Sequence, residues 1–319
     1  MRLLRSELLR ARSRRLVPML IIGGLLGIVV GMGLTAIYGG EASDAEIATA
    51  QTQYDKDFAQ CMKGRFLEHG GQLDPRYASL EEFCRDANAP SLDGAQLRDL
   101  DLIVQGISTF VVLLGTLLGA SLGGADWTNN TMTTLLTWEP RRVRVFFTRA
   151  LVVGAFVGVI TLFLQVVFSA AYWLVAVTRG TTLFLPTHFW TDVAATVGRV
   201  SAMGVALGLV AYVIAMVGRS TVASLGVLFG YLVLVEGVIA GFRPTIQGNL
   251  LVRAASVIVS QQPILDPTRE LVYYGSGVSG AVANPPILMD VHRAWIVLVV
   301  YVVVLGGLSL FQFQRRDVS

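Results

Sequence analysis

A short polar stretch, residues 126–149, separates two long apolar runs and holds the side chains best suited to binding a partner. It combines acidic, hydroxyl and amide residues with two tryptophans, a proline and four arginines. Tryptophan and arginine dominate the binding energy of many protein interfaces, and a simple turn between two helices needs fewer residues. We therefore expect a docking surface here. Its candidate residues are Asp126, Trp127, Thr131, Leu135, Trp138, Glu139, Arg141 and Arg142.

Four of these residues recur at helical spacing and predict one face of a short coupling helix. They are Trp127, Thr131, Leu135 and Trp138. Pro140 is expected to end this helix, because proline has no backbone N–H to donate. The arginines that follow can meet acidic side chains or lipid phosphates. An alternative stays open, because tryptophan and arginine also anchor the ends of membrane spans.

Catalytic and metal-binding patterns are not found in the sequence. No Gly-x-x-x-x-Gly-Lys-Ser/Thr phosphate loop occurs, and His69, His188 and His292 are not at metal-ligand spacing. The motif 277–280, Gly-Val-Ser-Gly, resembles the nucleophile motif of rhomboid intramembrane proteases, but no histidine follows it within a span. We therefore expect no enzyme activity and no metal or cofactor in this chain.

The elements that must position the polar stretch are membrane spans. Of the 319 residues, 54% are hydrophobic and 15% charged, whereas soluble domains carry about 25% charged residues. Unbroken apolar runs near or above about 20 residues predict spanning helices rather than barrel strands. The expected fold is an all-α polytopic membrane protein with six transmembrane helices. They are predicted at 16–38, 102–124, 150–177, 194–217, 222–241 and 294–313.

The distribution of arginines predicts the orientation. With the N-terminus inside, the cytoplasmic segments hold 13 arginines in 50 residues, and the opposite side holds 11 basic residues in 132. This bias satisfies the positive-inside rule, so both termini are expected in the cytoplasm of a multi-pass cell-membrane protein. No basic cluster outside the span ends indicates nucleic-acid binding. The cytoplasmic segments are 1–15, the coupling segment 125–149, 218–221 and the tail 314–319.

The first fifteen residues carry leucines on one helical face and arginines over much of the rest. This pattern favours an interfacial helix whose arginines reach the lipid headgroups. A plain positive stretch without a defined helix is the alternative.

Residues 39–101 are expected to form an extracellular loop domain with 13 acidic and six basic residues. The only two cysteines of the chain, Cys61 and Cys84, lie in it. Two cysteines on the outward side, without further metal ligands, predict a disulfide.

A second extracellular segment, 242–293, is rich in proline and glycine and is expected to contain a short helix. This helix could enter the outer leaflet or pack on neighbouring spans, and both possibilities stay open. The residues that share its helical face are Ile246, Leu250, Ala254, Val257 and Ile258.

Two charged residues, Arg199 and Glu236, lie inside predicted spans at similar depth. Each is costly to expose to lipid alone, so an intramembrane pair is expected. A substrate contact is the alternative.

The order of these features resembles the permeases of ABC-2-type transporters. Residues 135–142, Leu-Leu-Thr-Trp-Glu-Pro-Arg-Arg, match a family run that follows an acidic residue, here Asp126, and precedes a basic residue that opens the third span, here Arg149. The chain differs at Asn130, where the family usually has glycine, and in having Arg149 where lysine is usual.

This resemblance implies a bacterial permease subunit that exports a hydrophobic or amphipathic substrate. It further implies two kinds of partner: a cytoplasmic ABC ATPase, which binds ATP and magnesium, and a second permease copy or paralogue, all among membrane lipids. Two other classes of function remain open. One is a non-transporting membrane sensor or assembly protein that binds its ligand through the extracellular loop, and the other is a secondary transporter.

Overall fold

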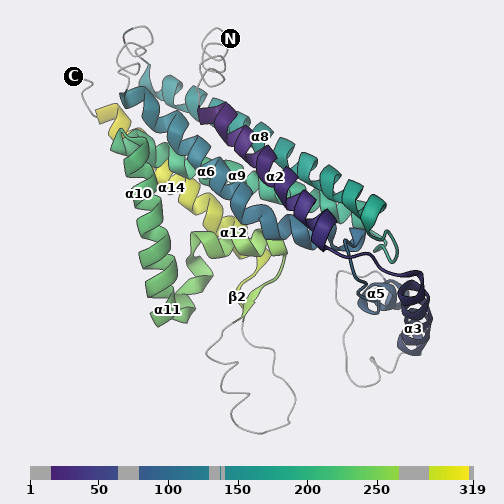
Figure 1. Cartoon of the computed structure of the whole chain (residues 1–319). Coiled ribbons are helices and arrows are strands. Elements are labelled where there is room, and N and C mark those ends of the chain that lie inside the picture. The colour runs from purple at the N-terminus through teal and green to yellow at the C-terminus, as the bar shows by residue number, and fades with distance from the viewer. Residues whose placement is uncertain (1–15, 64–78, 129–136, 138–140, 266–286, 316–319) are drawn as a thin grey trace. The chain divides into compact units, whose positions relative to one another are not determined.

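The computed structural model describes residues 16–63, 79–128, 137, 141–265 and 287–315. This part of the chain contains six helices that are long and apolar enough to cross a membrane. Each predicted span falls within one of them, so the protein is a helical, multi-pass membrane protein (Figure 1). The spans are α2 (Leu16–Tyr38), α6 (Leu100–Thr128), α8 (Arg142–Arg179), α9 (Phe189–Gly218), Thr221–Phe242, and α14 (Val291–Arg315).

The chain divides into two compact units, and the boundary passes through α2, α6, α8 and α9. Unit 1 comprises Met1–Ile21, Ile107–Phe163 and Gly198–Ser319. Unit 2 comprises Ile22–Gly106 and Leu164–Val197.

Glycines bring α6 and α9 together within unit 1. A Cβ atom at Gly115 would lie 2.8 Å from the carbonyl oxygen of Gly204, and one at Gly119 would overlap the carbonyl of Gly208. Because only hydrogen occupies these positions, the two backbones approach directly, as small residues allow between membrane helices.

The segment between the last two spans packs into the core of unit 1. It begins with the 3-10 helix η3 (Pro244–Asn249), continues as α12 (Leu251–Ser260), and includes a two-stranded ribbon of β1 (Ile264–Leu265) and β2 (Ile287–Met289). The predicted short helix is therefore present. Its buried side chains share a core with Val200, Met203 and Leu298, so packing on the spans is the arrangement that forms.

The span Thr221–Phe242 is helical but not uniformly α-helical. It consists of α10 (Thr221–Gly230), the π-helix η2 (Tyr231–Ile239) and α11 (Ala240–Phe242). The Ser220 hydroxyl begins α10 by accepting the N–H of Ala223 at 3.4 Å, the usual role of an N-cap serine. π-Helical turns are rare and often mark functional positions.

The loop region of unit 2 contains α3 (Asp44–Met62) and α5 (Leu80–Ala87). Both helices begin at a serine three residues before a glutamate, the pattern of a capping box. The hydroxyls of Ser43 and Ser79 accept the N–H groups of Glu46 and Glu82, each at 3.2 Å.

The same region is tied to the loop between α8 and α9. The N–H of Leu97 donates to the carbonyl of Thr181 at 2.9 Å, and the N–H of Thr181 donates to the carbonyl of Ala95 at 3.0 Å. The hydroxyl of Tyr172 donates to the carbonyl of Gln96 at 2.9 Å. These bonds give the buried backbone groups of the loop their partners.

Three expectations fall on parts of the chain that are not described. The predicted interfacial helix 1–15 and the tail 316–319 lie outside the described residues, as does most of the predicted coupling helix. In the described part, α8 begins at Arg142, before the predicted span 150–177, so the end of the predicted segment 125–149 is helical. Arg149 therefore lies inside a helix, and it is only 4% exposed.

Candidate docking site

Half of the candidate docking residues lie in the described part of the chain. Asp126 and Trp127 belong to the last turn of α6, and Arg141 and Arg142 lie where α8 begins. The others, Thr131, Leu135, Trp138 and Glu139, lie outside the described residues. The structure therefore describes mainly the two ends of the polar segment, residues 126–128 and 141–149.

The indole ring of Trp127 packs against residues from two other helix ends. The guanidinium of Arg219 lies 4.8 Å from its ring centroid, and the ring of Phe313 meets it edge-on at 6.4 Å. A cation over an indole face and an edge-to-face aromatic pair are both attractive arrangements. Trp127 therefore ties the end of α6 to the α9–α10 turn and to α14.

This environment limits the surface that Trp127 can offer to a docking partner. An indole that packs on Arg219 and Phe313 of its own chain offers only part of its surface to a partner. The membership of Trp138 in a docking face stays a prediction.

Arg142 ties the start of α8 to the end of α14. Its Nη1 donates to the carbonyl oxygens of Phe313 at 3.2 Å and of Gln314 at 3.1 Å. The last carbonyls of a helix have no partner within the helix, and a cation there also complements the helix dipole. Arg142 thus satisfies two terminal carbonyls of α14 in one contact.

The α9–α10 turn completes this cluster of helix ends. Arg219 has a φ of 52°, in the left-handed region, so the chain reverses sharply between Gly218 and Ser220. Farther along α10, the buried hydroxyl of Ser224 donates to the carbonyl of Ala211 in α9 at 2.7 Å. We call Trp127, Arg142, Arg219 and Phe313 the junction.

A small crevice opens between Trp127 and α14. Its walls include Met216, Ser309 and Gln312. Among the described residues, neither the buried Nε1 of Trp127 nor the buried Oε1 of Gln312 has a hydrogen-bond partner.

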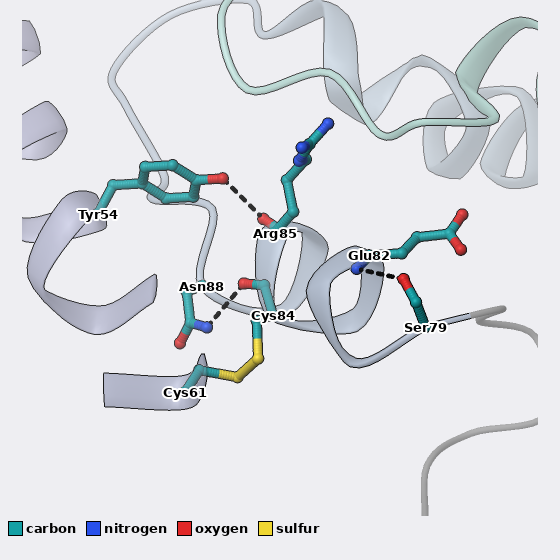
Figure 2. Close-up of a disulfide and its surroundings, with 7 residues drawn as sticks. All are labelled: Tyr54, Cys61, Ser79, Glu82, Cys84, Arg85 and Asn88. Atoms are coloured by element: carbon teal, nitrogen blue, oxygen red, sulfur yellow. Dashed lines mark hydrogen bonds between the residues drawn. A yellow bond between two sulfur atoms is a disulfide. The ribbon is translucent and has the colours of Figure 1, made fainter. Parts of the chain in front are cut away.

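The predicted disulfide is confirmed. Cys61 at the end of α3 and Cys84 in α5 are bonded, with their Cα atoms 5.7 Å apart (Figure 2). Cys84 is fully buried, and its carbonyl accepts the side-chain N–H of Asn88 at 2.8 Å.

The surroundings of α5 perturb two titratable groups of the loop region. Burial raises the pKa of Asp86 above its ordinary value of 3.8, and the neighbouring charge of Glu82 raises it further. Burial also raises the pKa of Tyr54, whose hydroxyl donates to the carbonyl of Arg85 at 3.4 Å (Figure 2).

Both members of the predicted intramembrane pair lie in described helices, Arg199 in α9 and Glu236 in η2. A carboxylate oxygen of Glu236 accepts the backbone N–H of Val252 at 2.6 Å. The pairing of Glu236 with Arg199 stays a prediction.

Within the described residues, no three His, Cys, Asp or Glu side chains gather at a distance that could hold a metal ion. No family model matches this sequence, and a search of curated proteins finds no significant match. The functional proposal therefore depends on the order of the spans, the polar segment and the junction.

Sequence reasoning missed the parts that Arg219 and Phe313 play in the junction. Phe313 reads as one more apolar residue of the last span, and Arg219 as an ordinary positive residue of a short loop. Their distance from Trp127 in the chain hides the contact.

Proposed function

We propose that this chain is the membrane-spanning permease subunit of an ABC-2-type transporter. In this proposal it lies in a bacterial cell membrane with both termini in the cytoplasm, and it exports a hydrophobic or amphipathic substrate. A separate ATPase subunit binds ATP and magnesium and supplies the energy, and a second permease copy or paralogue completes the membrane part. The resemblance of residues 126–149 to the family and the six apolar helices support this assignment.

The observation that carries the proposal is the junction. Trp127 and Arg142 flank the undescribed middle of the polar segment, and each is fixed to another helix end. A partner that displaced this segment would therefore move α6 and α8 together with the end of α14 and the α9–α10 turn. Coupling between sites requires such a contiguous, packed connection.

A site-specific photo-cross-linking experiment tests the docking step. The chain has lysines only at positions 56 and 63, so amine-reactive reagents would not report on the polar segment. A benzophenone amino acid at position 138, introduced in the native membrane, is expected to capture a phosphate-loop ATPase that mass spectrometry identifies. The matched control replaces Trp190, a 59% exposed tryptophan of unit 2.

The proposal fails if position 138 captures no ATPase, or if position 190 captures the same ATPase equally well. A sensor or assembly protein would instead capture a partner from the loop of residues 39–101 alone. A secondary transporter would move its substrate in vesicles that contain no ATPase.

A further inference from the structure

The span Thr221–Phe242, which we call span five, has few buried residues. Only 6% of the residues in its apolar window are buried, as in α2, compared with 61% for α9. Val222, Phe229 and Leu234 are exposed along its length. Apolar packing within the chain therefore holds this helix weakly, and its attachment depends on a few polar contacts.

The first attachment is at the start of the span. Ser224 is fully buried, and its hydroxyl donates to the carbonyl of Ala211 in α9 at 2.7 Å. The preceding turn reverses the chain at Arg219, whose φ is positive. This end is therefore fixed to α9 through a tight turn that can act as a pivot.

The second attachment is a pair of side chains from η2 that bind the start of α12. The N–H of Leu251 donates to the hydroxyl of Tyr231 at 3.0 Å, and the N–H of Val252 donates to the carboxylate of Glu236 at 2.6 Å. The N-cap residue of α12 is Leu250, whose side chain cannot accept a hydrogen bond. Tyr231 and Glu236 thus supply the caps that the sequence of α12 lacks.

The π-helical conformation places both caps on one side of span five. In an α-helix, residues five apart are separated by about 140° around the axis, because each turn contains 3.6 residues. In a π-helix, each backbone N–H donates to the carbonyl five residues earlier, so residues five apart lie near each other on the same side of the helix. Tyr231 and Glu236 are five residues apart within η2.

The same contacts extend to α14. The hydroxyls of Tyr231 and Tyr301 lie 3.3 Å apart, and that of Tyr301 donates to the carbonyl of Asn249 at 3.4 Å. Arg293 donates to the side-chain oxygen of Asn249 at 3.0 Å. The far end of span five is therefore held by a hydrogen-bonded cluster that includes the side chains of Tyr231, Glu236 and Tyr301.

We infer that span five is a hinged arm, with its pivot at Arg219–Ser224 and a polar latch formed by Tyr231 and Glu236 on α12. Opening the latch frees the far end of the arm, while α12 stays in the core of unit 1. Figure 1 shows α10 and α11 of the arm and the neighbouring α12. The arm and its latch do not depend on the transporter assignment, and they can be tested without any transport measurement.

Distance measurements between spin labels test the arm directly. The two native cysteines are bonded to each other, so thiol-reactive labels attach only to introduced cysteines. One label pair replaces Leu234 and Val303, which are 59% and 63% exposed, and reports on the latched part of the arm. The other replaces Val222 and Leu308 and reports on the pivot end, both positions being exposed.

The variant that opens the latch combines Tyr231→Phe with Glu236→Leu. We expect the 234–303 distances to broaden and lengthen in this variant, while the 222–308 distances stay as in the wild type. Glu46→Gln is the matched control, since Glu46 also accepts a backbone N–H, that of Asp93 in unit 2 at 2.9 Å. It should change neither pair of distances.

Hydrogen exchange at the amides of Leu251 and Val252 tests whether Tyr231 and Glu236 cap α12. The first measurement uses the wild-type chain. In the wild-type chain in lipid nanodiscs, the amides of Leu251 and Val252 should exchange slowly. Glu236→Leu should speed exchange at Val252 by about tenfold or more, and Glu236→Gln, which keeps an acceptor oxygen, by less. The inference is overturned if both wild-type amides exchange freely, or if the double variant leaves the 234–303 distances unchanged.

Discussion

The backbone of Gly119 in α6 lies directly against the carbonyl group of Gly208 in α9. A Cβ atom at Gly119 would overlap that carbonyl, and neither group is the far end of a flexible side chain that could move away. The separation of the two helices is therefore set at this point by the absence of a side chain.

Gly119→Ala should force α6 and α9 apart and destabilise unit 1 by about 1–3 kcal/mol, the usual cost of overpacking a close contact. Thermal unfolding of the purified protein in detergent, followed by tryptophan fluorescence, measures this loss. Gly226→Ala is the matched control, because a Cβ atom at Gly226 meets nothing within 4 Å. Equal unfolding midpoints for the two variants would show that the glycine contact does not set the helix separation.

Removal of the Cys61–Cys84 disulfide should destabilise the loop region of unit 2. The bond links residues 23 apart in the chain, and closing a loop of this size contributes about 3 kcal/mol in the chain-entropy description. The double variant Cys61→Ala/Cys84→Ala should expose the loop to limited proteolysis while the rest of the chain resists cleavage. Equal cleavage rates for the variant and the wild type would contradict this expectation.

The stability of the same region should depend on pH through Asp86. Because its pKa is raised by burial and then by Glu82, the folded loop holds this proton more tightly than the unfolded loop does. The resulting stabilisation is fully present below the ordinary value of 3.8 and is lost as the pH rises through the raised pKa.

Hydrogen exchange in peptides that cover 80–88, compared between wild type and Asp86→Asn at each pH, measures this dependence. The asparagine variant should be the more protected of the two at neutral pH, and the difference should shrink as the solution is acidified. A difference that stays constant from pH 3 to pH 7 would exclude Asp86 as its source.

The positions of the spans and of the disulfide could be predicted because each depends on local sequence. An unbroken apolar run fixes a spanning helix, and Cys61 and Cys84 had no other cysteine to pair with. The predicted span 150–177 lies within α8, which begins earlier, at Arg142, and includes Arg149. An arginine can be accommodated in a helix end once other elements cover it, and only the tertiary fold supplies those elements.

The π-helix and the junction could not be predicted for a related reason. Residues 231–239 are as apolar as an ordinary α-helical span, and nothing in their sequence pattern predicts a π-helix instead of an α-helix. The caps that Tyr231 and Glu236 provide are recognised only beside α12, whose own N-cap is a leucine. The contact of Trp127 with Phe313 likewise joins distant parts of the chain.

Arg142→Ala should fray the last turn of α14. The variant leaves the carbonyls of Phe313 and Gln314 without their guanidinium donor. Amide exchange in residues 311–315 should then rise by about tenfold, as expected for the loss of a hydrogen-bonded charged group. Arg315→Ala is the control, since its guanidinium lies over Phe311 of the same helix, 4.0 Å from the ring centroid. If both variants fray the turn equally, the contact from Arg142 is not what holds it.

The two tryptophans of the polar segment should have separable effects. Trp127 packs on Arg219 and Phe313 within the chain, so Trp127→Ala should lower the stability of unit 1 by about 1–2 kcal/mol. Trp138 is proposed to insert into the ATPase, where a buried tryptophan commonly contributes about 2 kcal/mol or more. Trp138→Ala should therefore weaken ATPase binding at least about tenfold and leave the unfolding temperature of the isolated chain unchanged.

Thermal unfolding of the isolated chain and titration with the ATPase identified by cross-linking at position 138 measure the two effects separately. Trp127→Phe serves as the conservative variant: it keeps an aromatic ring against Phe313 and should recover part of the lost stability. The contacts of Trp127 with Arg219 and Phe313 support its role in stability, and the role of Trp138 follows from the proposed docking. It is wrong if Trp138→Ala unfolds at a lower temperature than Trp127→Ala, or if the ATPase binds the Trp138 variant as tightly as the wild type.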